Sequence, residues 1–213
     1  FVHFDREIGE GEQVVIKLRH GGQLIEPDGQ SAISPLADWD WYPRPPALHR
    51  HEFEVSALMP RYWNVASTGR RLSEELDGSH RRIVSRSEPV ERGAVFLVSA
   101  DATTHSPPRA GLPVLRIFRS PSTPVPNLKP LAAEIYERLE ALEALVGPFP
   151  WAELDVVERG QGRGWSDTPG IIALGRVDAP PEQTVTTPVG SRTLLGALCR
   201  QVLQANLGPR SDH

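Results

Sequence analysis

The sequence has little of what marks several specialised classes of protein. It contains one cysteine among 213 residues, so no disulfide can form within the chain. No apolar run approaches the ~20 residues that a transmembrane helix needs. Neither sign of charge dominates, because 23 Lys and Arg stand against 27 Asp and Glu, for a net charge of -4. This balance excludes an electrostatic case for nucleic acid or an anionic membrane surface, and we expect neither partner.

Targeting signals are also missing from the sequence. The first residue is Phe1, and no signal peptide follows it. We therefore expect a piece of a longer protein, and the sequence indicates no compartment.

Proline is abundant, with 21 residues, and long proline-free runs are few before residue 126. Short segments between prolines favour strands and loops over helices. The segment 52–60 alternates strictly, with Phe53, Val55, Ala57 and Met59 on one side. A turn is predicted at Asp77 and Gly78. Further strands are predicted in "GAVFLVSA" (93–100) and "LPVLRIF" (112–118). Residues 1–118 are predicted to form an all-β, sandwich-like unit.

The pattern changes after a proline-rich linker at 119–130. A helical stripe runs through 128–147, and Gly147 is a natural C-cap. Short buried strands are predicted at 154–158 and 170–176, and a final helix at 191–206. We therefore predict an α+β fold with two units, 1–118 and 119–213, of which the second has the order helix–strand–strand–helix and is incomplete.

Several polar or aromatic clusters have ordinary structural interpretations. The acidic residues of the first helix are predicted to form a solvated face; they are Glu134, Glu137, Glu140 and Glu143. His49 and His51 could share a strand face, but no third metal ligand is near them. Cys199 lies on the apolar stripe of the final helix with no histidine nearby, which indicates a buried hydrophobe. Trp39, Trp41 and Tyr42 could stack on a peptide or sugar, or pack the edge of the sandwich.

One stretch, "GPFPWAELDVVERGQGRGWSDTPGIIALGR" (147–176), carries an ordered set of motifs. It begins with a G-x-F-P turn, continues with L-D-x-V, and ends with P-G before an apolar strand. Two further motif-bearing segments, "WYPR" (41–44) and "FEVSALMPRYWNVASTG" (53–69), precede this stretch in the sequence. Together these motifs resemble the zinc aminopeptidase family of aminopeptidase N and alanyl aminopeptidase, over roughly residues 10–206. The matching positions of the first stretch are Gly147, Phe149, Pro150, Leu154, Asp155, Val157, Gly164, Pro169, Gly170, Ile171 and Ile172.

The resemblance implies a place for each unit. Residues 1–118 would be the C-terminal part of the family's N-terminal β-domain. Residues 119–213 would be the opening part of a thermolysin-like peptidase domain.

The resemblance also places the family's metal helix at "LLGALCRQVLQAN" (194–206). Members carry H-E-x-x-H there, because two histidines four residues apart can bind one zinc ion while the glutamate acts as general base. The three positions hold Gly196, Ala197 and Arg200. None can ligate zinc, since glycine and alanine have no donor and a guanidinium has no lone pair to offer. We therefore expect no catalytic residue, no metal and no cofactor in this chain.

The family's G-x-M-E-N loop, whose glutamate binds the α-amino group of the substrate, corresponds to "GWSDT" (164–168). The substrate-binding candidates are then Gly164, Trp165, Asp167 and Thr168. Asp167 keeps the negative charge of the glutamate but is one methylene shorter. It could hold an amine or simply cap the turn before Pro169.

Three functional hypotheses follow. The first is an aminopeptidase-like module that has lost its zinc motif and acts as a structural or interaction part of a larger protein, with a protein or peptide partner. The second is a fragment of an active zinc aminopeptidase whose metal helix lies outside this chain. The third is a β-sandwich module that binds peptide or carbohydrate through Trp39 to Tyr42.

Overall fold

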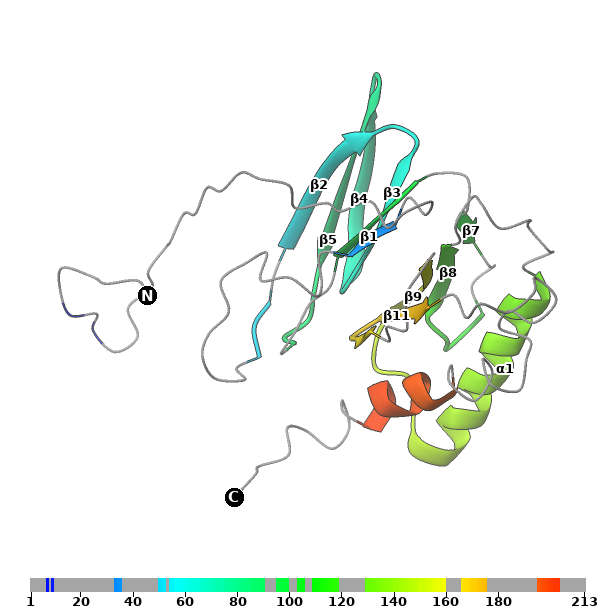
Figure 1. Cartoon of the computed structure of the whole chain (residues 1–213). Helices are drawn as coiled ribbons and strands as arrows, with labels where there is room; N and C mark the ends of the chain where they lie inside the picture. Colours follow the sequence, from blue (N-terminus) through cyan, green and yellow to red (C-terminus); the bar gives the residue numbers. More distant parts are fainter. Residues whose placement is uncertain are drawn as a thin grey trace.

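The computed structural model combines three β-sheets with two helices in the part of the chain that it describes (Figure 1). It therefore contains both helices and strands, with more sheet than helix, which is compatible with the predicted α+β class. Neither helix is long and apolar enough to cross a bilayer, among the residues searched. The described residues are 7, 9, 33–35, 50–52, 54–90, 95–99, 103–105, 109–118, 129–159, 166–175 and 195–203.

An antiparallel sheet of long strands has the order β2–β5–β4. Its strands are β2 (Glu54–Pro60), β4 (Arg70–Asp77) and β5 (His80–Arg86). β4 and β5 form a hairpin whose turn contains Gly78, with φ +54°, a conformation that glycine adopts without steric cost. The turn predicted at Asp77 and Gly78 is confirmed.

A second antiparallel sheet, β1–β6–β3, lies beside the first. It consists of β1 (Ile33–Pro35), β3 (Trp63–Ser67) and β6 (Val95–Ser99). Met59, Val65 and Ile83 form a buried cluster, with Val55 and Ala57 packed against it. The alternation predicted for 52–60 is thus confirmed for the three side chains from β2, while Phe53 lies outside the described residues.

The third sheet has five strands in the order β10–β11–β9–β8–β7. They are β7 (Thr103–His105), β8 (Val114–Phe118), β9 (Glu153–Arg159), β10 (Ser166–Thr168) and β11 (Ile171–Gly175). β9 is parallel to both β8 and β11, whereas both edge strands are antiparallel to their neighbours. Strands from both sides of the boundary expected between residues 118 and 119 therefore share one sheet.

Helix α1 (Lys129–Val146) supplies the crossover that the parallel pair β8 and β9 needs. Gly147 ends it at φ +98°, and its N–H donates to the carbonyl of Glu143 at 3.1 Å. The predicted helix and its glycine cap are confirmed. Glu137, Glu140 and Glu143 are exposed, as expected of a solvated face.

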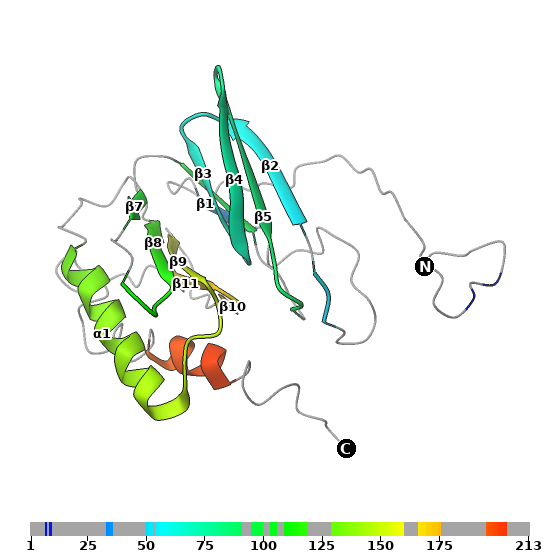
Figure 2. The ribbon, with the colours of Figure 1, turned by 180° about the vertical axis from the view of Figure 1, so that it is seen from behind.

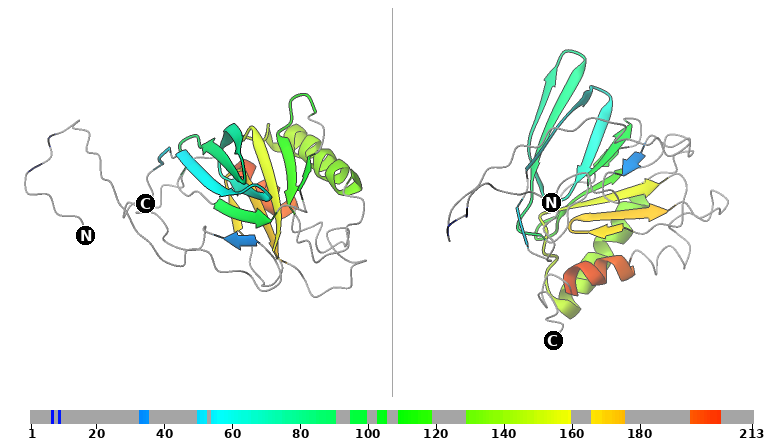
Figure 3. Two further views of the ribbon diagram at one scale, coloured as in Figure 1. Left: turned by 90° about the horizontal axis from the view of Figure 1, so that it is seen from above. Right: turned by 60° about the vertical axis from the view of Figure 1, so that its left-hand side comes forward.

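The main core lies between the five-stranded sheet and the helices. α1 and the helix over residues 195–203 cover the same side of this sheet, and the sheet β2–β5–β4 lies toward its other side (Figures 2 and 3). The helical part of the predicted final helix that the structure describes is 195–203. Buried side chains of this core include Leu115, Ile117, Ile135, Leu139, Leu154, Val156, Ile172, Ala197 and Leu198.

Candidate functional site

The positions that the resemblance assigns to the metal helix divide between two faces of the helix 195–203. Gly196 and Arg200, one turn apart, lie on the outer side; Gly196 is half-buried and Arg200 is exposed. A Cβ built on Gly196 would be 3.6 Å from Nη1 of Arg200, which is ordinary van der Waals contact. The guanidinium of Arg200 therefore lies back along the helix toward Gly196.

Ala197, at the position of the family's glutamate, belongs to the hydrophobic core. It is 0% exposed and packs in the cluster that contains Leu198 and Ile172. A carboxylate at this point would be placed among apolar side chains, where ionisation is costly. The packing therefore favours a small apolar residue at 197.

Gln201 joins this helix to the hairpin β10–β11. It is 3% exposed, and its Oε1 accepts the N–H of Gly170 at 3.2 Å. Its Nε2 donates to the carbonyls of Thr168 (3.0 Å) and Ile171 (2.9 Å). One buried amide thus satisfies three backbone groups of the hairpin.

Gln201 was not among the predicted site residues. The signal was available, because the helix buries Leu198 and Val202 and position 201 lies on the same face. A polar side chain on such a face is buried and needs hydrogen-bond partners.

The strand β10 contains two of the predicted substrate-binding residues, Asp167 and Thr168. Asp167 pairs with Ile172 and Thr168 with Ile171, and β10 forms one edge of the five-stranded sheet. The buried Oγ1 of Thr168 has no hydrogen-bond partner among the described residues. Gly164 and Trp165 lie outside the described residues. Gln201 therefore joins the backbone of Thr168 to the helix that carries Gly196 and Arg200, and among the described residues no hydrogen bond does so for the backbone of Asp167.

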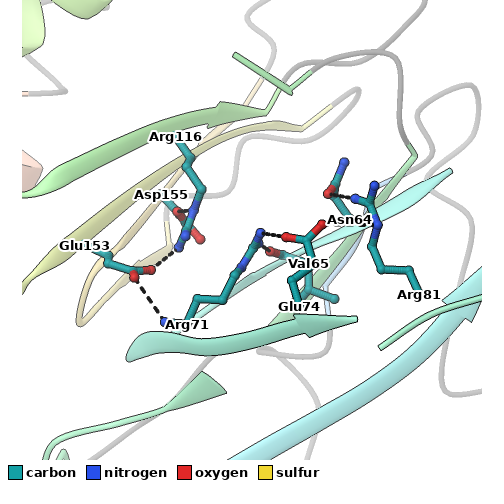
Figure 4. A network of polar contacts seen from close by, with 8 residues as sticks. All are labelled: Asn64, Val65, Arg71, Glu74, Arg81, Arg116, Glu153 and Asp155. Atoms are coloured by element: carbon teal, nitrogen blue, oxygen red, sulfur yellow. Dashed lines mark hydrogen bonds and ion pairs between the residues drawn. The ribbon is translucent and has the colours of Figure 1, made fainter. Parts of the chain in front are cut away.

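A network of charged side chains lies on the opposite face of the same sheet, toward β4 (Figure 4). Arg116 on β8 donates from Nε to Oδ1 of Asp155 on β9, at 2.6 Å. Its Nη2 donates to Oε2 of Glu153 at 2.5 Å. Glu153 also accepts the backbone N–H of Arg71 on β4, at 3.1 Å. Glu153 therefore connects the first β-sheet with the five-stranded sheet.

Arg71 extends this network into the two antiparallel sheets β2–β5–β4 and β1–β6–β3, which we call the β-unit. Its Nη1 donates to Glu74 at 2.8 Å, and its Nη2 donates to the carbonyl of Val65 at 3.0 Å. Two buried atoms of the network, Nε of Arg71 and Oδ2 of Asp155, have no hydrogen-bond partner among the described residues.

Burial and charge act differently on the two partners of the central ion pair. Burial raises the pKa of Asp155 above its ordinary value, and the attraction of Arg116 only partly opposes this effect. Burial alone would lower the pKa of Arg116, but the attraction of Asp155 and Glu153 outweighs it and raises that pKa. For Asp155, burial outweighs the attraction of Arg116 and Arg71, whereas for Arg116 the combined attraction of two carboxylates outweighs burial.

Arg116, Glu153 and Arg71 were not among the predicted site residues, and Asp155 entered only as a motif position. Arg116 and Asp155 each interrupt an otherwise apolar strand, "VLRIF" and "LDVV". A charge inside a buried strand predicts an opposite charge nearby. The sequence does not say which residue provides it, because the partners are 39 positions apart.

The residues at the predicted metal positions do not fit a zinc ion. Gly196 and Ala197 offer no donor atom, and the guanidinium of Arg200 offers no lone pair. In the described part of the chain, no group of three or more His, Cys, Asp and Glu residues could hold a metal ion. Of the remaining candidates, His51 forms a backbone bridge with Val90, and the others lie outside the described residues. These others are Trp39, Trp41, Tyr42 and His49.

Comparisons of sequence find no relative of this chain. No protein-family model matches the sequence, and a search of curated proteins finds no match either.

Solved structures do resemble it. An M1 zinc metallopeptidase from Deinococcus radiodurans superposes with a TM-score of 0.50 and 15% identity, covering 70% of this chain and 33% of that one. A mutant of a two-domain M1 zinc metallopeptidase bound to L-arginine gives 0.51 and 16%, with the same coverage. A mutant of the Deinococcus radiodurans protein bound to a Tyr-Ser-Ala substrate gives 0.50 and 14%, covering 68% of this chain and 33% of that one. The chain spans about a third of the length of these structures, and over that part its fold resembles that of the M1 zinc metallopeptidases.

Proposed function

We propose that this chain is an aminopeptidase-like module that has lost the zinc-binding motif and acts as a non-catalytic structural or interaction part of a larger protein. The observation that carries the proposal is that the helix 195–203 keeps its packing contacts and has no zinc donor at the proposed metal positions. It is docked on the hairpin by Gln201 and on the core by Ala197 and Leu198, while the three metal positions carry no zinc donor.

The proposal depends on a separation between packing and chemistry within one helix. The packing face needs apolar side chains and a satisfied amide, and these are present at Ala197, Leu198 and Gln201. Zinc ligation needs imidazole groups at positions 196 and 200, on the outer side of the helix, whereas position 197 of the catalytic glutamate is part of the packing face. A chain can therefore lose the imidazole groups and keep its folded arrangement.

The finer assignment of the two units belongs to the same proposal. Residues 1–118 would represent the C-terminal part of the family's N-terminal β-domain, and 119–213 the opening of the thermolysin-like domain. Within 119–213, the order α1, β9, β10, β11 and the helix 195–203 supports the second assignment. Because β7 and β8 pair within the same sheet as β9, we infer that the two units depend on each other structurally.

A peptide with a free amino terminus is the partner that this proposal favours. An edge strand such as β10 can pair with an extended chain through its backbone. The carboxylate of Asp167 has the charge needed to attract an ammonium group. The similar structures are of proteins bound to L-arginine and to Tyr-Ser-Ala, which is consistent with a ligand of this class.

Zinc analysis tests the proposal directly. The purified chain would be incubated with ZnCl₂, dialysed without chelator, and analysed for metal by mass spectrometry. We expect far less than one zinc per chain and no hydrolysis of aminoacyl-p-nitroanilides. The double variant Gly196→Ala/Arg200→Gln is the control, because it should retain as little zinc as the unmodified chain. One tightly held zinc per chain, or turnover that a zinc chelator abolishes, would overturn the proposal.

A further inference from the structure

A continuous series of polar contacts leads from the β-unit to the hairpin β10–β11 and the helix 195–203. It runs from Arg71 through Glu153, Arg116 and Asp155 to Gly170 and Gln201. We propose that the β-unit positions the hairpin β10–β11 and the helix 195–203 through this series, with Glu153 as the positioning residue. This inference goes beyond the proposed function, because it holds whether or not the module binds a peptide.

The first step of the series crosses between two sheets at Glu153. Its Oε1 accepts the backbone N–H of Arg71 on β4, and its Oε2 accepts Nη2 of Arg116 on β8. The side chains of Glu153 and Arg116 are 12% and 7% exposed. Both oxygens of one largely buried carboxylate are therefore used, one toward each sheet.

The second step passes through Asp155, which is 1% exposed. Its side chain accepts Nε of Arg116, while its backbone N–H donates to the carbonyl of Gly170 at 2.8 Å. Gly170 has φ +75°, and a Cβ there would be 3.2 Å from the carbonyl oxygen of Glu153. The turn between β10 and β11 is thus held close against β9.

The third step reaches the helix. The N–H of Gly170 donates to Gln201, whose amide also donates to Thr168 and Ile171. The carbonyl of Gly170 therefore accepts a hydrogen bond from β9, and its N–H donates one to the helix. The hairpin cannot shift relative to β9 without breaking one of these buried hydrogen bonds.

Burial makes this series effective as a means of positioning. A buried donor or acceptor that loses its partner keeps the full desolvation penalty without the hydrogen bond that offset it. The loss of one contact in the series therefore favours movement at the next contact. The alternative is that hydrophobic packing of Ala197 and Leu198 alone places the helix. In that case changes at Glu153, on the opposite face of the sheet, would leave the helix unaffected.

Hydrogen–deuterium exchange separates these two explanations. The full chain would be compared with Glu153→Gln, Glu153→Ala and the control Glu74→Ala. Glu74 contacts the side chains of Arg71 and Arg81 within the β-unit but makes no contact with Arg116. We expect amides of 166–175 and 195–203 to exchange roughly tenfold faster in Glu153→Ala, and at an unchanged rate in Glu74→Ala.

The Glu153→Gln variant is a conservative partial rescue. Its amide oxygen can still accept the N–H of Arg71, while the ion pair with Arg116 is lost, so exchange should be intermediate. It also keeps the test open if Glu153→Ala does not fold. Unchanged exchange of 195–203 in both Glu153 variants would overturn the proposal.

A double-mutant cycle gives an independent readout. The melting-temperature shifts of Glu153→Gln and Gln201→Met should be non-additive when the two are combined, whereas Glu74→Ala and Gln201→Met should add. Additive shifts for both pairs would also contradict the proposal. Neither result depends on peptide binding or on zinc content, so failure here is distinguishable from failure of the proposed function.

Discussion

At the scale of single residues, the helix 195–203 contains two kinds of position, which differ in whether they tolerate a polar or charged side chain. Ala197 is fully buried in the core, whereas Arg200, three residues later, is exposed. The resemblance assigns both to the metal motif, but the environment of each side chain differs. Replacing Ala197 with the family's glutamate would therefore disrupt the core, whereas replacing Arg200 with the family's histidine would not.

We predict that Ala197→Glu destabilises the protein strongly. A carboxylate in this apolar site lacks a partner, and the expected loss in the free energy of unfolding is about 3 kcal/mol or more. Arg200→Gln, at an exposed position of the same helix, should change it by about 0.5 kcal/mol or less. Urea unfolding of both variants measures the difference. Equal effects would show that Ala197 is not in a closed core.

The raised pKa of Asp155 predicts a pH dependence with a definite sign. Because the folded protein binds this proton more tightly than the unfolded chain, stability falls as pH rises from the ordinary pKa of 3.8 to the raised value. The variant Asp155→Asn lacks this titration and should keep the shape of the side chain. The free energy of unfolding of the unmodified protein should therefore fall relative to that of Asp155→Asn as the pH rises above 3.8. A relative increase over this range, measured by urea unfolding at several pH values, would contradict the assignment.

At the scale of elements, local patterns predicted most of the described strands and both helices. The alternation in 52–60, the turn at Gly78 and the stripe of α1 each depend on residues close in sequence. Such patterns are informative because the side-chain period of an element follows from its backbone geometry. The helical pattern could have indicated that Gln201 is buried, but not which groups it binds, because its partners belong to another element, 30 or more positions away.

Gly147 provides a test of how α1 ends. Its φ of +98° is a conformation that a side chain disfavours, so Gly147→Ala should lower the free energy of unfolding by about 1–2 kcal/mol. Gly196→Ala is the matched control. The φ of Gly196 is not positive and a Cβ there meets only ordinary contact, so this change should be neutral or stabilising by up to about 1 kcal/mol. The melting temperatures of the two variants should shift in opposite directions relative to the unmodified protein, or by clearly different amounts.

At the scale of the whole molecule, the arrangement of the sheets departs from a simple division into two units. The resemblance to M1 zinc metallopeptidases covers 70% of the chain, which is more than either unit alone contains. β8 pairs with β9 across the crossover helix, and Glu153 adds a contact from the five-stranded sheet to β4. The mixed sheet is therefore the place where the β-unit meets the candidate site.

The sequence alone determined most of the described elements, the turn at Gly78, the end of α1 at Gly147 and the balance of charge. All of these depend on residue chemistry or on neighbours within a few positions. Only the tertiary structure decided that Ala197 faces the core, that Gln201 holds the hairpin, and that Glu153 joins β4 to Arg116. The physical reason is that partners of buried polar groups come from distant segments, and their choice depends on how the sheets pack.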